Sequence, residues 1–271
     1  MVAVSIIMPT YNQAEFVTKA IKSIIDQKFD DWELIIINNF SSDGTLDKIK
    51  EFNDLRIQVY NYKNNGIIAA ARNLGINKAK GKYLAFLDSD DYWTPYKLSE
   101  CKRFLEKNNY DIVCHGEEWI TLNGKSIRRM FYGPDKAAET FSLIFNRNAF
   151  STSAVFLKKN IIEDVRGFNT DPKYKMVEDY DLWIRLSVRN FKFGFIKKIL
   201  GVYVVHNSTS RNALFKQMLS EINLLRFHFH DQRNIGGKFY YFYCIKRLSR
   251  LFMSYGLRYL KVHLEKNRLT K

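Results

Sequence analysis

The chain has 271 residues, enough to bury a large hydrophobic core without help from a disulfide or a metal. Its three cysteines are widely spaced and include no CxxC pair, which argues against a disulfide framework or a zinc site and favours a reducing cytoplasm. The net charge of +15 lies wholly in residues 185–271, which contain 18 Lys and Arg but three Asp and Glu. This asymmetry indicates a polyanionic partner, either nucleic acid or an anionic membrane. The alternative is a basic surface that serves only solubility.

The first residues, MVAVSIIMPTYN, have no basic leader, and Pro9 ends their apolar run, so we expect no signal peptide. No stretch reaches the ~20 apolar residues that a membrane-spanning helix needs. Short apolar runs predict strands over residues 4–8, 32–38, 57–62 and 83–88. Between them, apolar spacing and turn residues predict helices over 14–25, 43–52 and 67–79, and Thr94 and Pro95 are expected at the N-cap and first turn of another. This alternation predicts an α/β domain whose mainly parallel sheet is covered by helices on both faces.

Polar residues follow each of these four strands, in residues 9–12, 38–39, 64–66 and 88–91. The carboxyl ends of parallel strands meet at one edge of a sheet, where ligands bind, so we expect these residues to form one polar ligand site. No GxGxxG follows the first strand and no GKS/T motif occurs, which argues against a dinucleotide site or a P-loop.

The segment FLDSDDYW contains the clearest local pattern that indicates a binding site. Asp88 and Asp90 fall on one side of an extended chain, with Asp91 adjacent. Carboxylates held this close repel one another unless a proton or a cation lies between them. Oxygen ligands favour Mg²⁺ or Mn²⁺, which are commonly shared with a substrate diphosphate. The alternative is a solvated turn that leads into the next helix.

Four segments resemble, in the right order, the signature of glycosyltransferase family 2. They are VSIIMPTYNQAEFVTKAIKSIIDQKFDDWELIIINNFSSDGT, NNGIIAAARNLGINKAKGKYLAFLDSDDYW, VEDYDLWIRL and VYVVHNSTS. The resemblance covers about residues 3–210 and implies a Rossmann-like GT-A fold and inverting transfer of a sugar from a nucleotide sugar. We therefore predict a catalytic domain over 1–210 and a helical extension over 211–271.

The resemblance also implies which residues bind the donor and its metal. The nucleotide site would contain Pro9, Tyr11, Asn38, Asn39, Arg72, Asp88 and Ser89. Mn²⁺ or Mg²⁺ would be held by Asp88, Asp90, Asp91 and His206. The arginine that usually neighbours this histidine is replaced by Val204, so a structural role for His206 is the alternative.

The Asn38–Asn39 pair departs from the family pattern, which usually has Asp there. An amide oxygen can accept the uracil N3–H while the NH₂ donates to a uracil carbonyl, and a flipped amide could complement cytosine. UDP is the expected nucleotide. Both residues could instead serve only the turn.

The segment KMVEDYDLWIRL begins a predicted helix with three acids. By resemblance to the family's ED motif, Asp179 is the general base that deprotonates the acceptor hydroxyl. Glu178 and Asp181 are expected to orient site groups or to cap the helix. We expect the helix dipole to keep Asp179 ionised. The alternative is purely structural, because acids at a helix start gain roughly 0.3–1 kcal/mol from capping and the dipole.

The extension mixes aromatic and basic residues from Phe227 to Tyr259, a composition typical of a membrane-interface surface. Two helices packed on the catalytic domain are the alternative. Residues 115–175, expected to shape specificity for the donor sugar, the acceptor and the linkage position, offer only loops and NAFSTSAVFL.

These features predict an inverting glycosyltransferase that adds a hexose or N-acetylhexosamine to a glycan or lipid-linked acceptor of a surface polysaccharide: O-antigen, capsule or lipooligosaccharide. We expect it in the cytoplasm, peripheral on the inner face of the cytoplasmic membrane. The other class of function is a non-catalytic sugar-nucleotide or RNA binder. No RNP, KH or zinc-finger signature supports RNA, so we expect no nucleic-acid partner.

Overall fold

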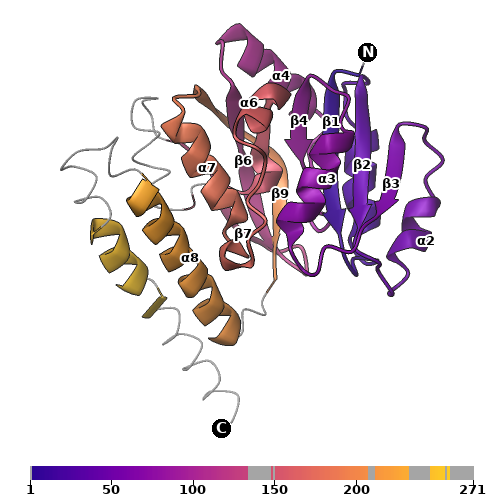
Figure 1. Ribbon diagram of the computed structural model, residues 1–271. Helices are drawn as coiled ribbons and strands as arrows, with labels where there is room; N and C mark the ends of the chain where they lie inside the picture. Colours follow the sequence, from indigo (N-terminus) through magenta and orange to yellow (C-terminus); the bar gives the residue numbers. More distant parts are fainter. Residues whose placement is uncertain are drawn as a thin grey trace.

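The computed structural model describes residues 2–133, 148, 150–206, 211–231, 245–253 and 255–256. Its centre is one sheet with the strand order β3-β2-β1-β4-β8-β6-β9-β5, and β7 pairs with β6 (Figure 1). The strands are β1 Val4–Thr10, β2 Trp32–Asn38, β3 Ile57–Asn61, β4 Tyr83–Phe86, β5 Tyr92–Trp93, β6 Ile112–Thr121, β7 Ser126–Met130, β8 Val155–Lys158 and β9 Phe193–Val205. The α-helices are α1 Val17–Ile25, α2 Thr45–Lys50, α3 Ile68–Lys78, α4 Lys97–Lys107, α6 Lys159–Asp164, α7 Glu178–Val188 and α8 Arg211–Asp231.

The predicted α/β class is confirmed, and the first four strands of the chain that were expected form the parallel part of the sheet. β3, β2, β1 and β4 are neighbours in that order, all parallel. Beyond β4 the sheet is mixed, because β8 runs antiparallel to β4 and β6, whereas β9 runs parallel to β6. The parallel character is therefore strongest in the N-terminal half.

Residues 115–175 contain more regular structure than the expected loops. Most of β6, all of β7 and β8, and α6 lie within this segment. The helix predicted from Thr94 is also corrected. It begins at Lys97 with Tyr96 as N-cap, because the backbone N–H of Thr94 is held by the Leu200 carbonyl oxygen at 3.0 Å, continuing the β5–β9 pairing.

Alternation along the buried strands separates two hydrophobic layers. Ile6 and Met8 of β1 face the layer that contains α1 and α4, whereas Ile7 faces the layer that contains α3 and α7. Gly75 lets α3 approach the sheet closely, since a Cβ there would lie 2.5 Å from Cγ2 of Ile7. Both faces of the central strands are therefore covered, which explains their continuous apolar runs.

The extension packs against the catalytic part, as one of the two alternatives predicted. α8 lies beside α7 in Figure 1, and Leu214, Leu224 and Leu225 are buried in the same core cluster as α7. α8 also exposes Phe215, Leu219 and Phe227. The predicted aromatic residues at 239–243 and 259, and the side chain of residue 229, lie outside the described residues. In the part of the chain that the structure describes, no helix is both long enough and apolar enough to cross a membrane.

Candidate active site

The ends of β1, β2 and β3 are tied together by hydrogen bonds, as the strand-end pattern predicts. The backbone N–H of Asn12, after β1, donates to Ser41 Oγ at 2.9 Å. The backbone N–H of Asn64, after β3, donates to Oδ1 of Asn39 at 3.0 Å. These contacts bring three separate turns to one edge of the sheet.

A cavity of about 510 Å³ opens at this edge. It is lined by Tyr11, Asn39, Phe40, Lys63 and Asn65. The side chains of Tyr11 and Phe40 are more than half exposed, at 55% and 59%. Two exposed aromatic faces beside an amide and a lysine suit a planar polar ring that carries an anionic group.

The structure gives the two neighbouring asparagines different surroundings. Asn38 is buried; its Nδ2 donates to Oδ1 of Asn61 at 2.7 Å, and its Oδ1 accepts from Ser41 Oγ at 2.6 Å. These bonds support the turn interpretation for Asn38, whereas Asn39 lines the cavity. Pro9 is buried within β1 and does not line it.

Arg72 joins the acidic segment after β4 to the start of α7. Its Nη2 lies 2.8 Å from Oδ1 of Asp88, and its Nη1 lies 2.8 Å from Oε1 of Glu178. The side chain of Arg72 is only 3% exposed, and its guanidinium holds these two carboxylates; its place in the nucleotide site stays a prediction. Among the described residues, Nε of Arg72 and Oε2 of Glu178 have no hydrogen-bond partner, so each atom is available for one more hydrogen bond.

The predicted metal residues divide into two groups. Oδ2 of Asp90 lies 2.7 Å from Nε2 of His206. Burial, and then the charge of nearby Asp88, raise the pKa of Asp90, although His206 opposes them. Asp91 instead points inward: Oδ1 accepts from the Val204 backbone N–H at 2.9 Å, and Oδ2 accepts from Ser153 Oγ at 2.6 Å. Ser89 is buried between the acids.

Asp88, Asp90 and His206 offer oxygen and nitrogen donors that suit Mn²⁺ or Mg²⁺. Mutual repulsion between the two carboxylates is the condition that a cation would relieve. As the described side chains stand, no group of three His, Cys, Asp or Glu is arranged to hold a metal by itself. The oxygen and nitrogen donors of Asp88, Asp90 and His206 fit a cation that is shared with a substrate diphosphate.

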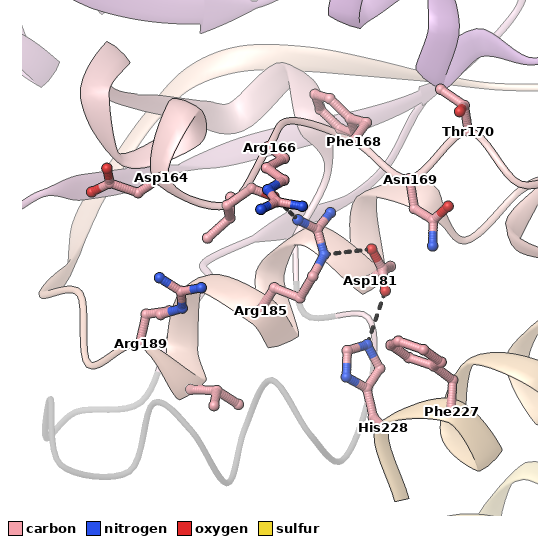
Figure 2. A pocket seen from close by; sticks show the side chains of 12 residues that line it. Asp164, Arg166, Phe168, Asn169, Thr170, Asp181, Arg185, Arg189, Phe227 and His228 are labelled. Carbon is pink, nitrogen blue, oxygen red and sulfur yellow. Dashed lines mark hydrogen bonds and ion pairs between the residues drawn. The ribbon is translucent and has the colours of Figure 1, made fainter. Parts of the chain in front are cut away.

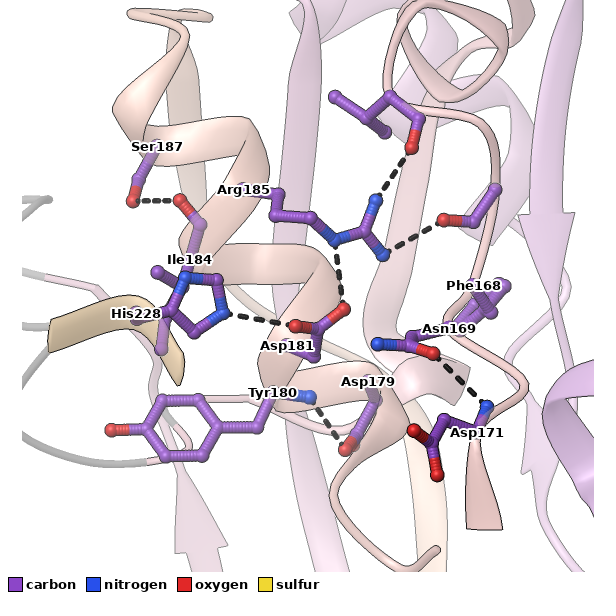
Figure 3. Close-up of polar contacts among 12 residues, drawn as sticks. Phe168, Asn169, Asp171, Asp179, Tyr180, Asp181, Ile184, Arg185, Ser187 and His228 are labelled. Carbon is purple, nitrogen blue, oxygen red and sulfur yellow. Dashed lines mark hydrogen bonds and ion pairs between the residues drawn. The ribbon is translucent and has the colours of Figure 1, made fainter. Parts of the chain in front are cut away.

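Asp179 lies half-buried in the first turn of α7. Its Oδ1 accepts from the Tyr180 backbone N–H at 2.7 Å (Figure 3), and Nδ2 of Asn148 lies 3.2 and 3.1 Å from its two oxygens. Burial and the Glu178 carboxylate raise the pKa of Asp179 to about 7, although Arg72 and Asn148 oppose them. Burial and Glu178 thus work against the ionised state that the helix dipole was expected to favour. A pKa near neutrality suits a general base.

Asp181, two residues further on, has a supporting role. It is buried, with Oδ2 accepting from Nε of Arg185 at 2.7 Å and Oδ1 lying 2.9 Å from Nε2 of His228 (Figure 3). These partners lower the pKa of Asp181 against the effect of burial. The contacts connect α7 to α8.

Three residues beside these groups were missed in the sequence. Phe40 could have been noticed as an aromatic directly after the asparagine pair. Asn148 and Ser153 contact Asp179 and Asp91 across 31 and 62 residues, respectively, and no local pattern marks such contacts.

The sequence and the fold are both similar to those of known proteins. The model of the family "Glycosyl transferase family 2" matches residues 5–166. The chain is 30% identical over 226 residues to WfgD of Escherichia coli, a UDP-Glc:alpha-D-GlcNAc-diphosphoundecaprenol beta-1,3-glucosyltransferase, covering 82% of this chain and 85% of that protein. It is 31% identical to the O-antigen biosynthesis glycosyltransferase WbnJ of Escherichia coli, covering 78% and 83% of the two chains.

A solved structure of similar fold is the mannosyltransferase PcManGT from Pyrobaculum calidifontis in complex with GDP-Man and Mn²⁺. The TM-score is 0.62 at 14% identity, covering 95% of this chain and 86% of that one. At this identity the similarity concerns the fold, and the GT-A architecture implied by the sequence is confirmed.

Proposed function

The chain belongs to glycosyltransferase family 2, and from this premise we propose that it transfers one hexose or N-acetylhexosamine from a UDP-linked donor to a lipid-linked saccharide of a surface polysaccharide. The names of two relatives support the proposal: WfgD uses UDP-Glc and a diphosphoundecaprenol-linked sugar, and WbnJ acts in O-antigen biosynthesis. The aromatic cavity at Tyr11 and Phe40 would receive the uracil, with Asn39 as the amide that reads its edge.

The proposed reaction is a single displacement at C1 of the donor sugar. Asp179 takes the proton from the acceptor hydroxyl, and that oxygen forms a bond to C1. The bond from C1 to the nucleoside diphosphate breaks on the opposite side, and its electron pair leaves with the diphosphate. Attack from the side opposite to the leaving group inverts the configuration at C1.

The remaining site residues position these groups. Arg72 joins Glu178, the chain neighbour of Asp179, to Asp88, so the first turn of α7 is held close to the donor aspartates, Asp88 and Asp90. Asp88, Asp90 and His206 would hold Mn²⁺ or Mg²⁺, which supplies positive charge to stabilise the departing diphosphate. Asp91 would shape the segment through Ser153 and Val204.

We place the enzyme on an anionic membrane surface as a peripheral protein in the cytoplasm. α8 exposes Phe215 and Leu219, and the helical segment 245–253 exposes Ile245, Phe252 and Met253. The net charge of the surrounding residues 185–271 is +15. Exposed apolar side chains within a basic segment suit the interface of an anionic bilayer.

The observation that supports transfer best is Asp179, a carboxyl with a pKa of about 7 that is linked through Glu178 and Arg72 to the donor aspartates. A donor panel tests the proposal: UDP-, GDP- and CMP-linked sugars with Mn²⁺, with and without a polyprenyl-diphosphate-linked N-acetylglucosamine acceptor. We expect acceptor-dependent release of UDP. Exclusive use of GDP or CMP donors would overturn the nucleotide assignment, and no release from any donor would overturn the transferase assignment.

A further inference from the structure

A second cavity, of about 760 Å³, lies on the α8 side of α7 (Figure 2). Its wall consists of the segment 164–170 with Asp181, Arg185, Val188, Arg189, Phe227 and His228. It shares no lining residue with the aromatic cavity at Tyr11, and the donor aspartates do not line it. We call it the arginine cavity, after Arg166, Arg185 and Arg189.

The charge of the arginine cavity favours an anion. Its wall has three guanidinium groups and two carboxylates, those of Asp164 and Asp181. Asp181 is already paired with Arg185 and His228. Within the described part of the chain, neither Arg166 nor Arg189 has an ion-pair partner, and both are exposed. Among the described residues, the unpaired guanidiniums of Arg166 and Arg189 therefore outnumber the unpaired carboxylate of Asp164 in this wall.

The backbone presents Arg166 to the cavity at some cost. Arg166 has a φ of 60°, in the left-handed region that non-glycine residues rarely adopt. Arg185 fixes the chain on both sides of it, since Nη1 donates to the Val165 carbonyl oxygen at 2.6 Å and Nη2 to the Gly167 carbonyl oxygen at 2.8 Å. Arg185 is therefore structural, and it holds the strained turn that carries Arg166. Strain that the surroundings enforce is a recognised feature of binding sites.

The rest of the wall is suited to an apolar group. Phe227 of α8 is 48% exposed, and Val165, Phe168 and Val188 also line the cavity. Figure 2 shows Phe227 and His228 entering from α8, with the arginine side chains reaching in from the segment 164–170 and from α7. Guanidinium donors next to an aromatic and aliphatic wall match a phosphate attached to an apolar chain.

The position of the arginine cavity relates it to the reacting group. α7 contributes both Asp179, at its first turn, and Asp181 and Arg185 in the cavity wall, and its C-cap residue Arg189 also lines the cavity. Asn169 lines this cavity and also a small pocket that contains Glu178, the neighbour of Asp179. A ligand bound in the cavity would therefore lie beside the helix that holds the base.

We propose that the arginine cavity binds the phosphate groups of a polyprenyl-diphosphate-linked acceptor, with the start of its lipid chain against Phe227. This rests on the proposed transferase function and adds the site and the chemistry by which the acceptor is held. The shared ligand chemistry, a phosphate ester on an apolar chain, could also come from a phospholipid headgroup, and the test separates the two.

The test uses full-length protein with UDP and Mn²⁺ in excess, so that the donor site is filled. Farnesyl diphosphate, inorganic diphosphate and phosphatidylglycerol vesicles are titrated separately into wild type, into Arg166→Gln/Arg189→Gln, and into the control Arg103→Gln/Lys107→Gln, which removes two positive charges from α4. We expect the first double variant to bind farnesyl diphosphate at least about tenfold more weakly, and the control to stay within about twofold of wild type. Inorganic diphosphate should bind more weakly than farnesyl diphosphate to wild type, because it has no chain to contact Phe227.

Equal affinity of wild type and the Arg166→Gln/Arg189→Gln variant for farnesyl diphosphate would overturn the proposal. So would a loss confined to the phosphatidylglycerol vesicles, since the arginines would then bind a membrane headgroup. Thermal unfolding of each variant verifies that it is folded. The titration needs no turnover, so it can fail while the wild-type donor panel still shows UDP release, which keeps this inference separable from the proposed function.

Discussion

Arg72 and Glu178, 106 residues apart in the chain, form a buried ion pair with 2.8 Å between Nη1 and Oε1. The same guanidinium bonds Asp88, so one side chain holds the acidic segment after β4 and the first turn of α7. The distance between Asp88, in the proposed donor-sugar site, and the turn that carries Asp179 therefore depends on the forked shape of the Arg72 guanidinium. A lysine would keep the charge but not the fork.

Arg72→Lys tests this dependence. We expect the transfer rate to fall at least about a hundredfold, because Asp88 and the start of α7 lose their common partner. The free energy of unfolding should fall by about 3 kcal/mol, since a buried carboxylate is left without its partner. Urea unfolding and steady-state kinetics measure the two effects. Arg103→Lys is the control, because the exposed Arg103–Glu100 pair is worth less than about 1 kcal/mol. Equal effects of the two substitutions would contradict the account.

The pH dependence of transfer should report Asp179. The pKa of this carboxyl is raised to about 7, and a base acts only when deprotonated, so the rate should fall as the pH drops below about 7, by about tenfold per pH unit. Asn148→Ala removes hydrogen bonds that lower this pKa, so the acid limb should move to higher pH. The exposed Asn77→Ala serves as control and should leave the limb in place. A shift to lower pH in Asn148→Ala would show that the titrating group is not Asp179.

Phe40 offers a direct test of the nucleotide cavity. Loss of a stacking aromatic ring costs about 1–3 kcal/mol per base, so Phe40→Ala should weaken UDP binding by about tenfold or more. Tyr96→Ala is a matched control, because Tyr96 is also 59% exposed and does not line the cavity. Isothermal titration with UDP and Mn²⁺ measures both. If the two variants bind UDP equally well, the base does not stack on Phe40.

The sequence predicted well those features that depend on neighbouring residues. The runs at 4–8 and 32–38 became β1 and β2, because continuous apolar side chains need burial on both faces. The strand-end rule located Tyr11 and Asn39 beside one cavity. It could not separate Asn38 from Asn39, because the burial of Asn38 depends on Asn61 of β3.

The features that the sequence did not predict depend on contacts between distant segments of the chain. The helix dipole at Asp179 can be read from the local pattern, but the opposing burial and the charge of Glu178 require the folded site. The inward turn of Asp91 likewise depends on Val204 and Ser153, which come from distant segments. The mixed part of the sheet was missed because β6 and β8 pair antiparallel across distant segments of the chain, and no local pattern marks such a pairing.

The central claim is that Asp179 is the base, and Asp179→Asn tests it most directly. The variant keeps the size of the side chain and can still accept from Tyr180, so folding and UDP affinity should stay within about twofold of wild type. The amide cannot take a proton, and sugar transfer measured by UDP release with acceptor should fall by at least about a thousandfold. A variant that binds UDP normally and retains transfer within about tenfold of wild type would contradict the assignment of Asp179 as the base.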